Sequence, residues 1–268
     1  MIDLHTHTNH SDGSDTPPEL LRLAAEAGLT ALAITDHDTF SGYEEAVLLP
    51  NPPSLELIRG IELSCRQEHR SAHLLGYFFE PPEPAFLKWL EQMRASRRDR
   101  NLRLAKRLRE LGAEVDVAEA EAIGRTITGR PHFARLLVSK GYARSIDDAF
   151  RRYLSEDASA YVEWRGPTLE EGIQKICEGG GISSLAHPVR INNPWQEELI
   201  RRLSELGLNA LEVFHSDHSP EDAARFLRLA ARYRLGVTGG SDYHGVIKPS
   251  VRLGSVKVEP RWLEALRA

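Results

Sequence analysis

The sequence predicts an α/β protein in which a parallel sheet or barrel is interrupted by a helical insert. Short apolar runs alternate with helical patterns at both ends of the chain, as in repeated strand–helix units. Between Phe79 and Tyr161 there is no strong strand signal. With 268 residues, the chain suits one large domain that carries a smaller insert. We therefore expect residues 1–82 and 166–268 to form a barrel and residues 83–165 to be a helical insert.

The first part of the chain alternates strands and helices. Apolar residues at helical spacing, a proline pair at the start and Gly28 near the end predict a helix over 17–29. The continuous apolar run at 31–35 predicts a buried parallel strand. Further strands are predicted at 2–4, 55–61 and 72–79, which are rich in Leu, Ile and aromatic residues.

The insert is predicted to be helical and basic. A long, heavily charged helical pattern covers 84–112, and shorter ones cover 132–139 and 146–154. Residues 83–165 contain 17 Lys and Arg against 13 Asp and Glu, a net charge of +4, whereas the remainder has 17 against 26, a net −9. A solvated helix face explains most charge runs of this kind. The alternative, which stays open, is a basic lid over an acidic, metal-binding cup.

The strand–helix rhythm returns after the insert. The helical pattern at 168–178 ends at three consecutive glycines. Strands are predicted at 182–186, 210–214 and 237–238, and helices at 195–206 and 220–235. A last strand is predicted at 256–258.

The composition excludes several classes of protein. The two cysteines, Cys65 and Cys177, are too few for a disulfide framework or a four-cysteine zinc site. No apolar run approaches the roughly 18 residues of a membrane span. The beginning, MIDLHTHT, has no basic segment before an apolar stretch, so we expect no signal peptide and a cytoplasmic protein. With eleven histidines, any bound metal would be held by imidazole and carboxylate.

Potential metal ligands recur at the predicted strand ends. His5 and His7 are two residues apart after the first strand, so both can face one ion. The carboxyl ends of parallel strands are where active sites of α/β folds are built. So many buried charges would be costly without a compensating cation. Each residue alone has an ordinary structural explanation, but together nine of them favour a metal site: His5, His7, Asp12, His37, Glu62, His73, His187, Asp242 and His244. We expect no such role for His10 and His69, which lie in polar loops.

The order of these residues resembles the polymerase-and-histidinol-phosphatase (PHP) family of metal-dependent phosphoesterases. The resemblance covers nearly the whole chain, through His5-Thr6-His7, Ser11-Asp12-Gly13, Thr35-Asp36-His37, Glu62, His73, His187-Pro188 and Asp242-x-His244. It implies a distorted (β/α)7 barrel with two or three divalent metal ions. The periodicity of the sequence alone gives no strand number.

The resemblance also implies how the ligands are shared. His5, His7, Glu62 and Asp242 would hold one metal ion. Glu62 would bridge to a second, which His73 and His187 also bind, and Asp12, His37 and His244 would hold a third. Such ligands suit Mn²⁺, Fe²⁺ or Zn²⁺. Asp36, Asp38 and His215 lie near the strand ends and are predicted either to act as the general acid or to support the ligands.

Basic residues suggest what the substrate is. Arg130, His132 and Arg135 lie in the insert, and Arg135 can share a helix face with His132. Together with Arg190 and His218, they resemble the branch of the family with 3′,5′-nucleotide bisphosphate phosphatases and 5′→3′ exoribonucleases. That resemblance implies that the insert caps the active site and that Arg135, Arg190 and His218 hold a substrate phosphate that is not cleaved. Arg130 and His132 are also expected to bind substrate. Arg144, Arg151 and Arg152 are expected to be ordinary surface residues.

Several functions are compatible with this pattern. The first is removal of the 3′-phosphate from a 3′,5′-bisphosphonucleotide such as pAp, which gives a 5′-mononucleotide. Alternatives are 5′→3′ trimming of short 5′-phosphorylated RNA and hydrolysis of histidinol phosphate. A non-enzymatic alternative is a metal-binding accessory module of a polymerase. The net charge of −5 argues against tight binding to long duplex nucleic acid, so a small nucleotide or short oligonucleotide is the expected partner.

Overall fold

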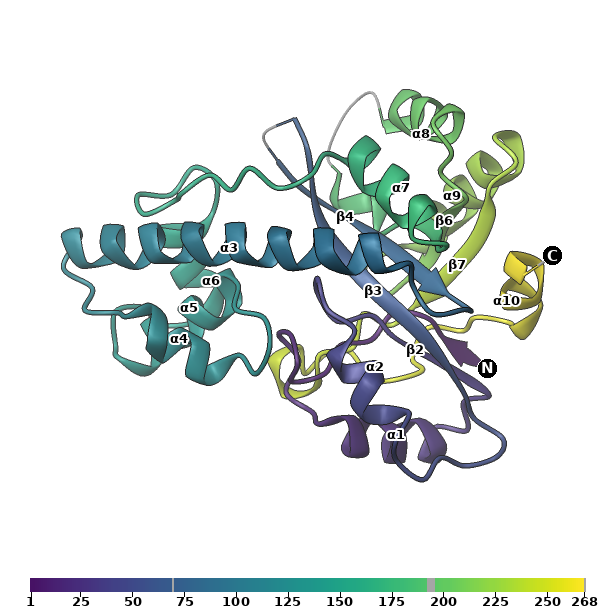
Figure 1. Cartoon of the computed structure of the whole chain (residues 1–268), viewed down its shortest axis with the longest axis horizontal. Coiled ribbons are helices and arrows are strands. Elements are labelled where there is room, and N and C mark those ends of the chain that lie inside the picture. The colour runs from purple at the N-terminus through teal and green to yellow at the C-terminus, as the bar shows by residue number, and fades with distance from the viewer. Residues whose placement is uncertain (69, 192–195, 268) are drawn as a thin grey trace.

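The computed structural model describes residues 1–268 except 69, 192–195 and 268. Seven strands form one sheet in chain order, and the sheet curls into a nearly closed barrel (Figure 1). The first and last strands meet through a backbone hydrogen bond from Leu4 N to Gly239 O of 3.1 Å. The expected seven-stranded barrel is therefore confirmed. The strands are β1 (Ile2–Asp3), β2 (Ala31–Ile34), β3 (Glu56–Gln67), β4 (Arg70–Phe78), β5 (Ile182–Leu185), β6 (Ala210–His215) and β7 (Gly236–Gly240).

One strand runs against the others, a feature that the expected strand–helix repeats did not indicate. β4 pairs antiparallel with both β3 and β5, whereas the remaining neighbours pair in parallel. β3 and β4 form a long hairpin in which His73 lies opposite Ser64, two residues beyond Glu62. His73 therefore reaches the edge of the barrel at which the parallel strands end, although it lies near the start of its own strand.

Helices cover the outside of the barrel. α7 packs on β3, β4 and β5, while α9 packs on β6 and β7. Two short helices, α2 and α10, were not predicted, and the predicted strand at 256–258 contributes only an isolated bridge between Val258 and Ile2. Among the described helices, none has the length and apolar character needed to cross a membrane. The helices of the barrel are α1 (Pro17–Glu26), α2 (Ser41–Ala46), α7 (Leu169–Glu178), α8 (Gln196–Glu205), α9 (Pro220–Arg232) and α10 (Pro260–Arg267). The predicted start of α8, Trp195, lies outside the described residues, as does His69.

The insert begins with one long helix, α3 (Pro84–Glu110), which runs away from the barrel in Figure 1. Its first half contributes Phe86 and Leu90 to the barrel core. Its second half contributes Leu104 and Leu108 to a separate cluster that is confined to residues 104–162. That second core supports the predicted division at 82/83 and 165/166, which stays a prediction. The rest of the insert comprises α4 (Val117–Ile123), which was not predicted, α5 (Arg130–Ser139), α6 (Ile146–Ala149) and a π-helical turn (Phe150–Leu154).

The insert is tied to the loops that follow β1 and β2. Ile127 N donates a hydrogen bond of 3.1 Å to His10 O. The His10 ring lies between Thr126 Oγ1, at 2.9 Å, and Glu45 Oε2, at 3.0 Å, so this histidine has an ordinary structural role. Arg97 of α3 forms an ion pair with Asp38. These contacts fix the insert over the edge of the barrel where the potential ligands lie.

Candidate metal centre

Glu62 lies at the centre of a cluster of five histidines. It is 1% exposed, near the middle of β3. Its Oε1 lies 2.8 Å from His73 Nδ1 and 2.9 Å from His187 Nε2. Its Oε2 lies 3.4, 3.1 and 3.2 Å from the rings of His5, His7 and His37. One carboxylate thus contacts five histidines from four separate segments of the chain.

The first pair of histidines also faces a second carboxylate. Nε2 of His5 and Nε2 of His7 each lie 3.4 Å from Oδ1 of Asp242. The ligand atoms of these residues and Glu62 lie within 4.8 Å of one another, and all four residues are buried. This grouping corresponds to the first of the three expected metal sites.

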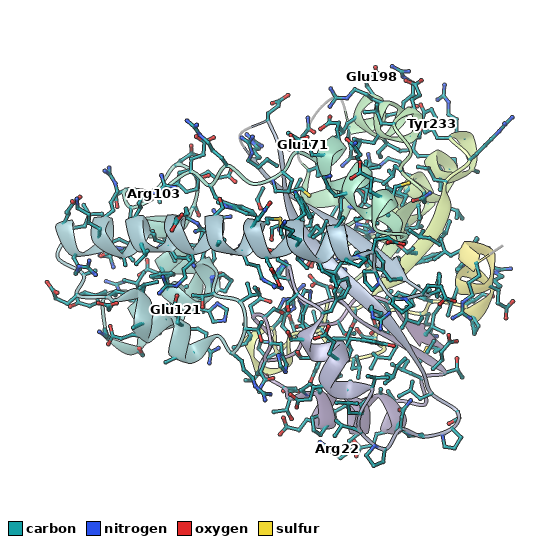
Figure 2. All side chains as sticks on the ribbon, in the orientation of Figure 1. Arg22, Arg103, Glu121, Glu171, Glu198 and Tyr233 are labelled. Atoms are coloured by element: carbon teal, nitrogen blue, oxygen red, sulfur yellow. The ribbon has the colours of Figure 1, made fainter. Side chains whose placement is uncertain are left out.

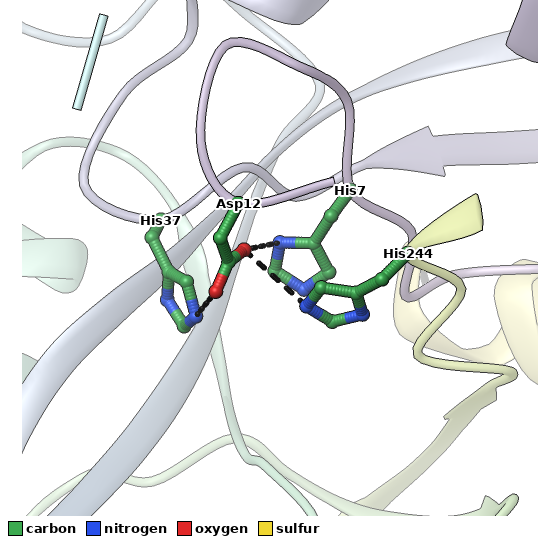
Figure 3. A group of neighbouring side chains, drawn as sticks. All are labelled: His7, Asp12, His37 and His244. Atoms are coloured by element: carbon green, nitrogen blue, oxygen red, sulfur yellow. Dashed lines mark ion pairs between the residues drawn. The ribbon is translucent and has the colours of Figure 1, made fainter. Parts of the chain in front are cut away.

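A neighbouring group surrounds Asp12, as Figure 3 shows. Its carboxylate lies 3.3 Å from His244 Nε2, 3.6 Å from His37 Nε2 and 3.7 Å from His7 Nδ1. Three of these four residues form the third expected site, and His7 lies between this group and the first. The structure therefore brings all nine potential ligands into one cluster.

The atoms at the centre fit divalent metal ions. Nε2 of His5 and of His7, Nδ1 of His37 and Oδ1 of Asp12 are buried and have no hydrogen-bond partner among the described residues. Buried polar atoms in folded proteins are almost always satisfied, so several unsatisfied atoms aimed at one space indicate a ligand. A mixed set of imidazole and carboxylate donors is one that Mn²⁺, Fe²⁺ and Zn²⁺ accept.

The electrostatics of the cluster also call for a cation. Burial lowers the pKa of His7, but the nearby carboxylates of Asp242 and Glu62 outweigh it and raise that pKa to about 10. Burial raises the pKa of Glu62, but the charges of His37 and His73 hold it well below its usual value. Burial and the charge of Arg190 lower the pKa of His187 to about 3, so its imidazole is neutral at neutral pH, the form that binds metals.

Three residues that follow strands have a backbone conformation that L-residues rarely adopt. Asp38, His187 and Asp242 have φ angles of 53°, 26° and 57°. Each such residue costs about 1–3 kcal/mol and persists where the surroundings enforce it. Two of the three are potential ligands and the third directly follows one. Three of the five described non-glycine residues with a positive φ thus lie beside the cluster; the other two are Glu68 and Arg234.

Glu212, on β6, belongs to the site although the sequence analysis did not select it. Its Oε1 lies 2.9 Å from His5 Nδ1, and its Oε2 accepts the backbone N–H of His187 at 2.5 Å. Burial raises the pKa of Glu212, but the charges of His5 and His215 lower it to about 2. A fully ionised carboxylate behind His5 turns the opposite ring nitrogen toward the cluster.

Asp36, Asp38 and His215, the expected acid or supporting residues, lie behind the cluster. Asp36 accepts hydrogen bonds from Thr8 and Ser11. Asp38 accepts one of 2.8 Å from Ser64 N and another from Arg97. His215 Nδ1 accepts the N–H of Asp217, and its Nε2 lies 3.4 Å from Asp242 Oδ2. None of the three borders the cavity in front of the cluster, so this geometry favours support over proton donation.

That cavity has a volume of about 510 Å³ and lies between the cluster and the insert. Of the residues expected to bind substrate, Arg130, His132 and Arg190 line it, whereas Arg135 and His218 do not. Both ring nitrogens of His132 are engaged, at 3.0 Å from Gly129 N and 3.0 Å from Ser11 O. Although it borders the cavity, this histidine therefore holds the insert against the loop that carries Asp12, and both of its ring nitrogens are already engaged.

Comparison with known proteins identifies the family. A model of the PHP domain matches residues 3–147, and the chain matches several members along most of their length. The chain belongs to the PHP family. The chain superposes on the crystal structure of a protein described as a metal-dependent phosphoesterase from Bifidobacterium adolescentis, with a TM-score of 0.89 and 33% identity over 99% of this chain and 94% of that one.

Three relatives of this PHP protein bear the names of specific enzymes. The 5′-3′ exoribonuclease Rnm of Escherichia coli (strain K12) is 35% identical over 250 residues, 91% of this chain and 85% of the relative. A phosphoribosyl 1,2-cyclic phosphate 1,2-diphosphodiesterase of Eggerthella lenta is 36% identical over 253 residues, 91% and 94% of the two chains. A 3′,5′-nucleoside bisphosphate phosphatase of Chromobacterium violaceum is 32% identical over 247 residues, 91% and 87%. The prediction of a metal-dependent phosphoesterase is thereby confirmed.

Proposed function

We propose that this PHP phosphoesterase removes the 3′-phosphate from 3′,5′-bisphosphonucleotides and releases a 5′-mononucleotide. The observation that carries the proposal is a single cavity bordered by the His–Asp–Glu cluster on the barrel side and by arginines on the insert side. Its volume of about 510 Å³ lies in the range of small-ligand sites, about 300–1,000 Å³. A substrate with two phosphates can engage both sides at once.

The nine clustered side chains would hold the metal ions in the grouping described above, with Glu62 shared between groups. When bound, the metal ions lower the pKa of a coordinated water and neutralise charge that develops on the phosphate. We propose that each chain binds two or three ions. Mn²⁺, Fe²⁺ and Zn²⁺ all suit this set of imidazole and carboxylate ligands.

The chain's own residues orient the substrate and limit access of water. Arg190 lines the cavity and donates to Asp242 Oδ2 at 2.8 Å, so its charge lies beside the cluster. Guanidinium groups match phosphate oxygens with paired donors. The insert covers the cavity, and its contacts with Ser11 and Asp38 keep it in place. A substrate bound there lies between the barrel and the insert.

The relatives support this class of substrate. One is named as a bisphosphate phosphatase, and the Eggerthella enzyme is named for a phosphoribosyl cyclic phosphate. Both names describe a small sugar phosphate. The exoribonuclease relative favours a second candidate function, which is the trimming of short RNA that carries a 5′-phosphate.

A substrate panel with added Mn²⁺ tests the proposal. It compares a 3′,5′-bisphosphonucleotide, a 5′-phosphorylated dinucleotide, histidinol phosphate and 4-nitrophenyl phosphate by kcat/KM. We expect the bisphosphonucleotide to be the best substrate by at least about tenfold, the difference that 1.4 kcal/mol of transition-state stabilisation makes. A higher kcat/KM for the dinucleotide would favour the exoribonuclease, and a preference for histidinol phosphate would contradict both.

A further inference from the structure

Arg100 is a buried arginine without a counterion. It lies on α3, is 4% exposed, and its Nε is buried without a hydrogen-bond partner. No hydrogen bond or ion pair joins its guanidinium group to any other residue that the structure describes. Arginine is almost never fully buried unless it is paired, because an isolated charge is costly away from water. An anion that binds here would supply the missing partner.

Two further arginines of the insert lie close to it. Arg130 donates to Leu154 O at 3.3 Å, and its guanidinium lies 5.9 Å from the ring centroid of Tyr161. It has no ion pair within the described part of the chain. Arg97 is already paired with Asp38 and stacks over Trp164 at 4.2 Å.

The positive charges of the three arginines repel one another. Burial lowers the pKa of Arg100 to about 9, and the positive charges of Arg97 and Arg130 act in the same direction. Burial likewise lowers the pKa of Arg130, and the positive charge of Arg97 acts in the same direction. Arg100 and Arg130 together therefore present two charges that are not matched by ion pairs, next to a third.

All three arginines line the cavity that also borders Glu62, His187 and Asp242. The arginines belong to the insert and the cluster to the barrel. The carboxylate of Glu156 also lines this side, and it accepts the N–H of Ser71 at 2.8 Å. A ligand in the cavity can therefore touch the cluster with one end and the arginines with the other.

We propose that Arg100 and Arg130 bind the phosphate that the reaction leaves intact. This inference rests on the proposed function, since it assumes a substrate with a second phosphate. A phosphate dianion carries two negative charges and several acceptor oxygens, which match two guanidinium groups. None of the three residues that the family resemblance assigns to this phosphate is retained, and Arg130 was expected only to bind substrate. Arg135 and His218 do not line the cavity, and Arg190 lies beside the cluster, paired with Asp217 and Asp242.

Substitution of Arg100 tests the inference with the metal-loaded, full-length chain. Arg100→Met removes the charge but keeps an extended side chain, Arg100→Lys keeps the charge, and Arg103→Met is the control. Arg103 lies on the same helix, is exposed and is labelled in Figure 2. For each variant, KM and kcat are measured with a 3′,5′-bisphosphonucleotide and with 4-nitrophenyl phosphate. Binding of 5′-AMP, which retains the intact phosphate, is measured by calorimetry.

We expect Arg100→Met to raise the KM for the bisphosphonucleotide and the Kd for 5′-AMP by about tenfold to a hundredfold, the range for a hydrogen bond to a charged group. Kinetics with 4-nitrophenyl phosphate should stay within about twofold of the wild type, and Arg100→Lys should recover part of the loss. The melting temperature of Arg100→Met should be unchanged or higher, because an unpaired buried charge is removed. A purely structural arginine would instead lower it.

The outcomes separate this inference from the proposed function. Equal losses on both substrates, or 5′-AMP binding that does not depend on Arg100, would overturn the inference. If the wild type does not hydrolyse bisphosphonucleotides but 5′-AMP binding still depends on Arg100, the phosphate site stands and the proposed substrate falls.

Discussion

Nδ1 of His5 lies 2.9 Å from Oε1 of Glu212, a residue 207 positions later in the chain. The other oxygen of Glu212 accepts the backbone N–H of His187. One carboxylate thus sets the orientation of one histidine ring and the backbone of another. Partners of this kind fix the tautomer of a metal-binding imidazole and increase its basicity.

Glu212→Gln should therefore weaken metal binding without removing a ligand. Loss of such a partner typically reduces metal affinity or activity by about 10–100-fold. Metal content after dialysis against a graded chelator series, measured by elemental analysis, checks this. Glu205→Gln, at the exposed end of α8, is the matched control. If both variants retain metal equally, Glu212 has no positioning role.

Glu62→Gln should have a larger effect, because this carboxylate contacts five histidines. We expect more than about a hundredfold loss of kcat, exceeding the effect of a supporting residue. The variant should also purify with less metal than the wild type. Treating the wild type with EDTA should abolish hydrolysis, and Mn²⁺ should restore it. Restoration of the variant to wild-type kcat by excess Mn²⁺ would show that Glu62 is dispensable.

The ion pair between Asp38 and Arg97 joins barrel and insert, with side chains that are 0% and 11% exposed. Removing one partner of a buried pair leaves an uncompensated charge and costs about 3–5 kcal/mol. Asp38→Asn should lower the free energy of unfolding by about 3 kcal/mol in urea titrations. The double variant with Arg97→Met should lose less than the sum of the single changes. If the loss of unfolding free energy in the double variant equals the sum of the two single losses, the two side chains are not energetically coupled.

The two thiols should react very differently. Cys65 is 2% exposed, and burial, followed by the charge of Asp38, raises its pKa well above the usual value. Cys177 is exposed at the end of α7. The thiolate is the form of cysteine that reacts with Ellman's reagent and releases thionitrobenzoate. At pH 8, one thiol of the native protein should react rapidly, whereas the second should react only after unfolding. Cys177→Ser should abolish the rapid phase; its persistence would mean that Cys65 is accessible.

The order of strands and helices was predictable because local patterns encode it. The apolar run at 31–35 became β2, and the proline pair and Gly28 bracketed α1 closely. The direction of β4 was not predictable, because neither the alternation of side chains nor the amino-acid composition of a strand depends on the direction in which the strand runs. Its reversal depends on the long hairpin with β3, which only the pairing of the two strands reveals.

Most of the potential metal ligands were predictable because they follow apolar runs, at whose ends parallel topology gathers side chains. Glu62 follows such a run, although β3 continues past it to Gln67. Glu212 was missed because apolar residues flank it on both sides. A charged residue within the otherwise apolar segment Ala-Leu-Glu-Val-Phe was the available signal, since such residues are rarely buried without a partner. Arg100 had no comparable signal among 17 basic residues of the insert. Its burial arises only when α3 packs against the rest of the insert.

The continuity of α3 limits how this protein can change in length. The same helix begins in the barrel core and ends in the core of the insert, and Arg97 and Arg100 lie between the two. Each residue added to an α-helix turns everything beyond it by about 100° and moves it by about 1.5 Å. A single insertion after Met93 would rotate both arginines away from the cavity and misalign the second core. Only changes close to whole helical turns preserve the phase, so this segment should tolerate far fewer insertions and deletions than the loops around the barrel.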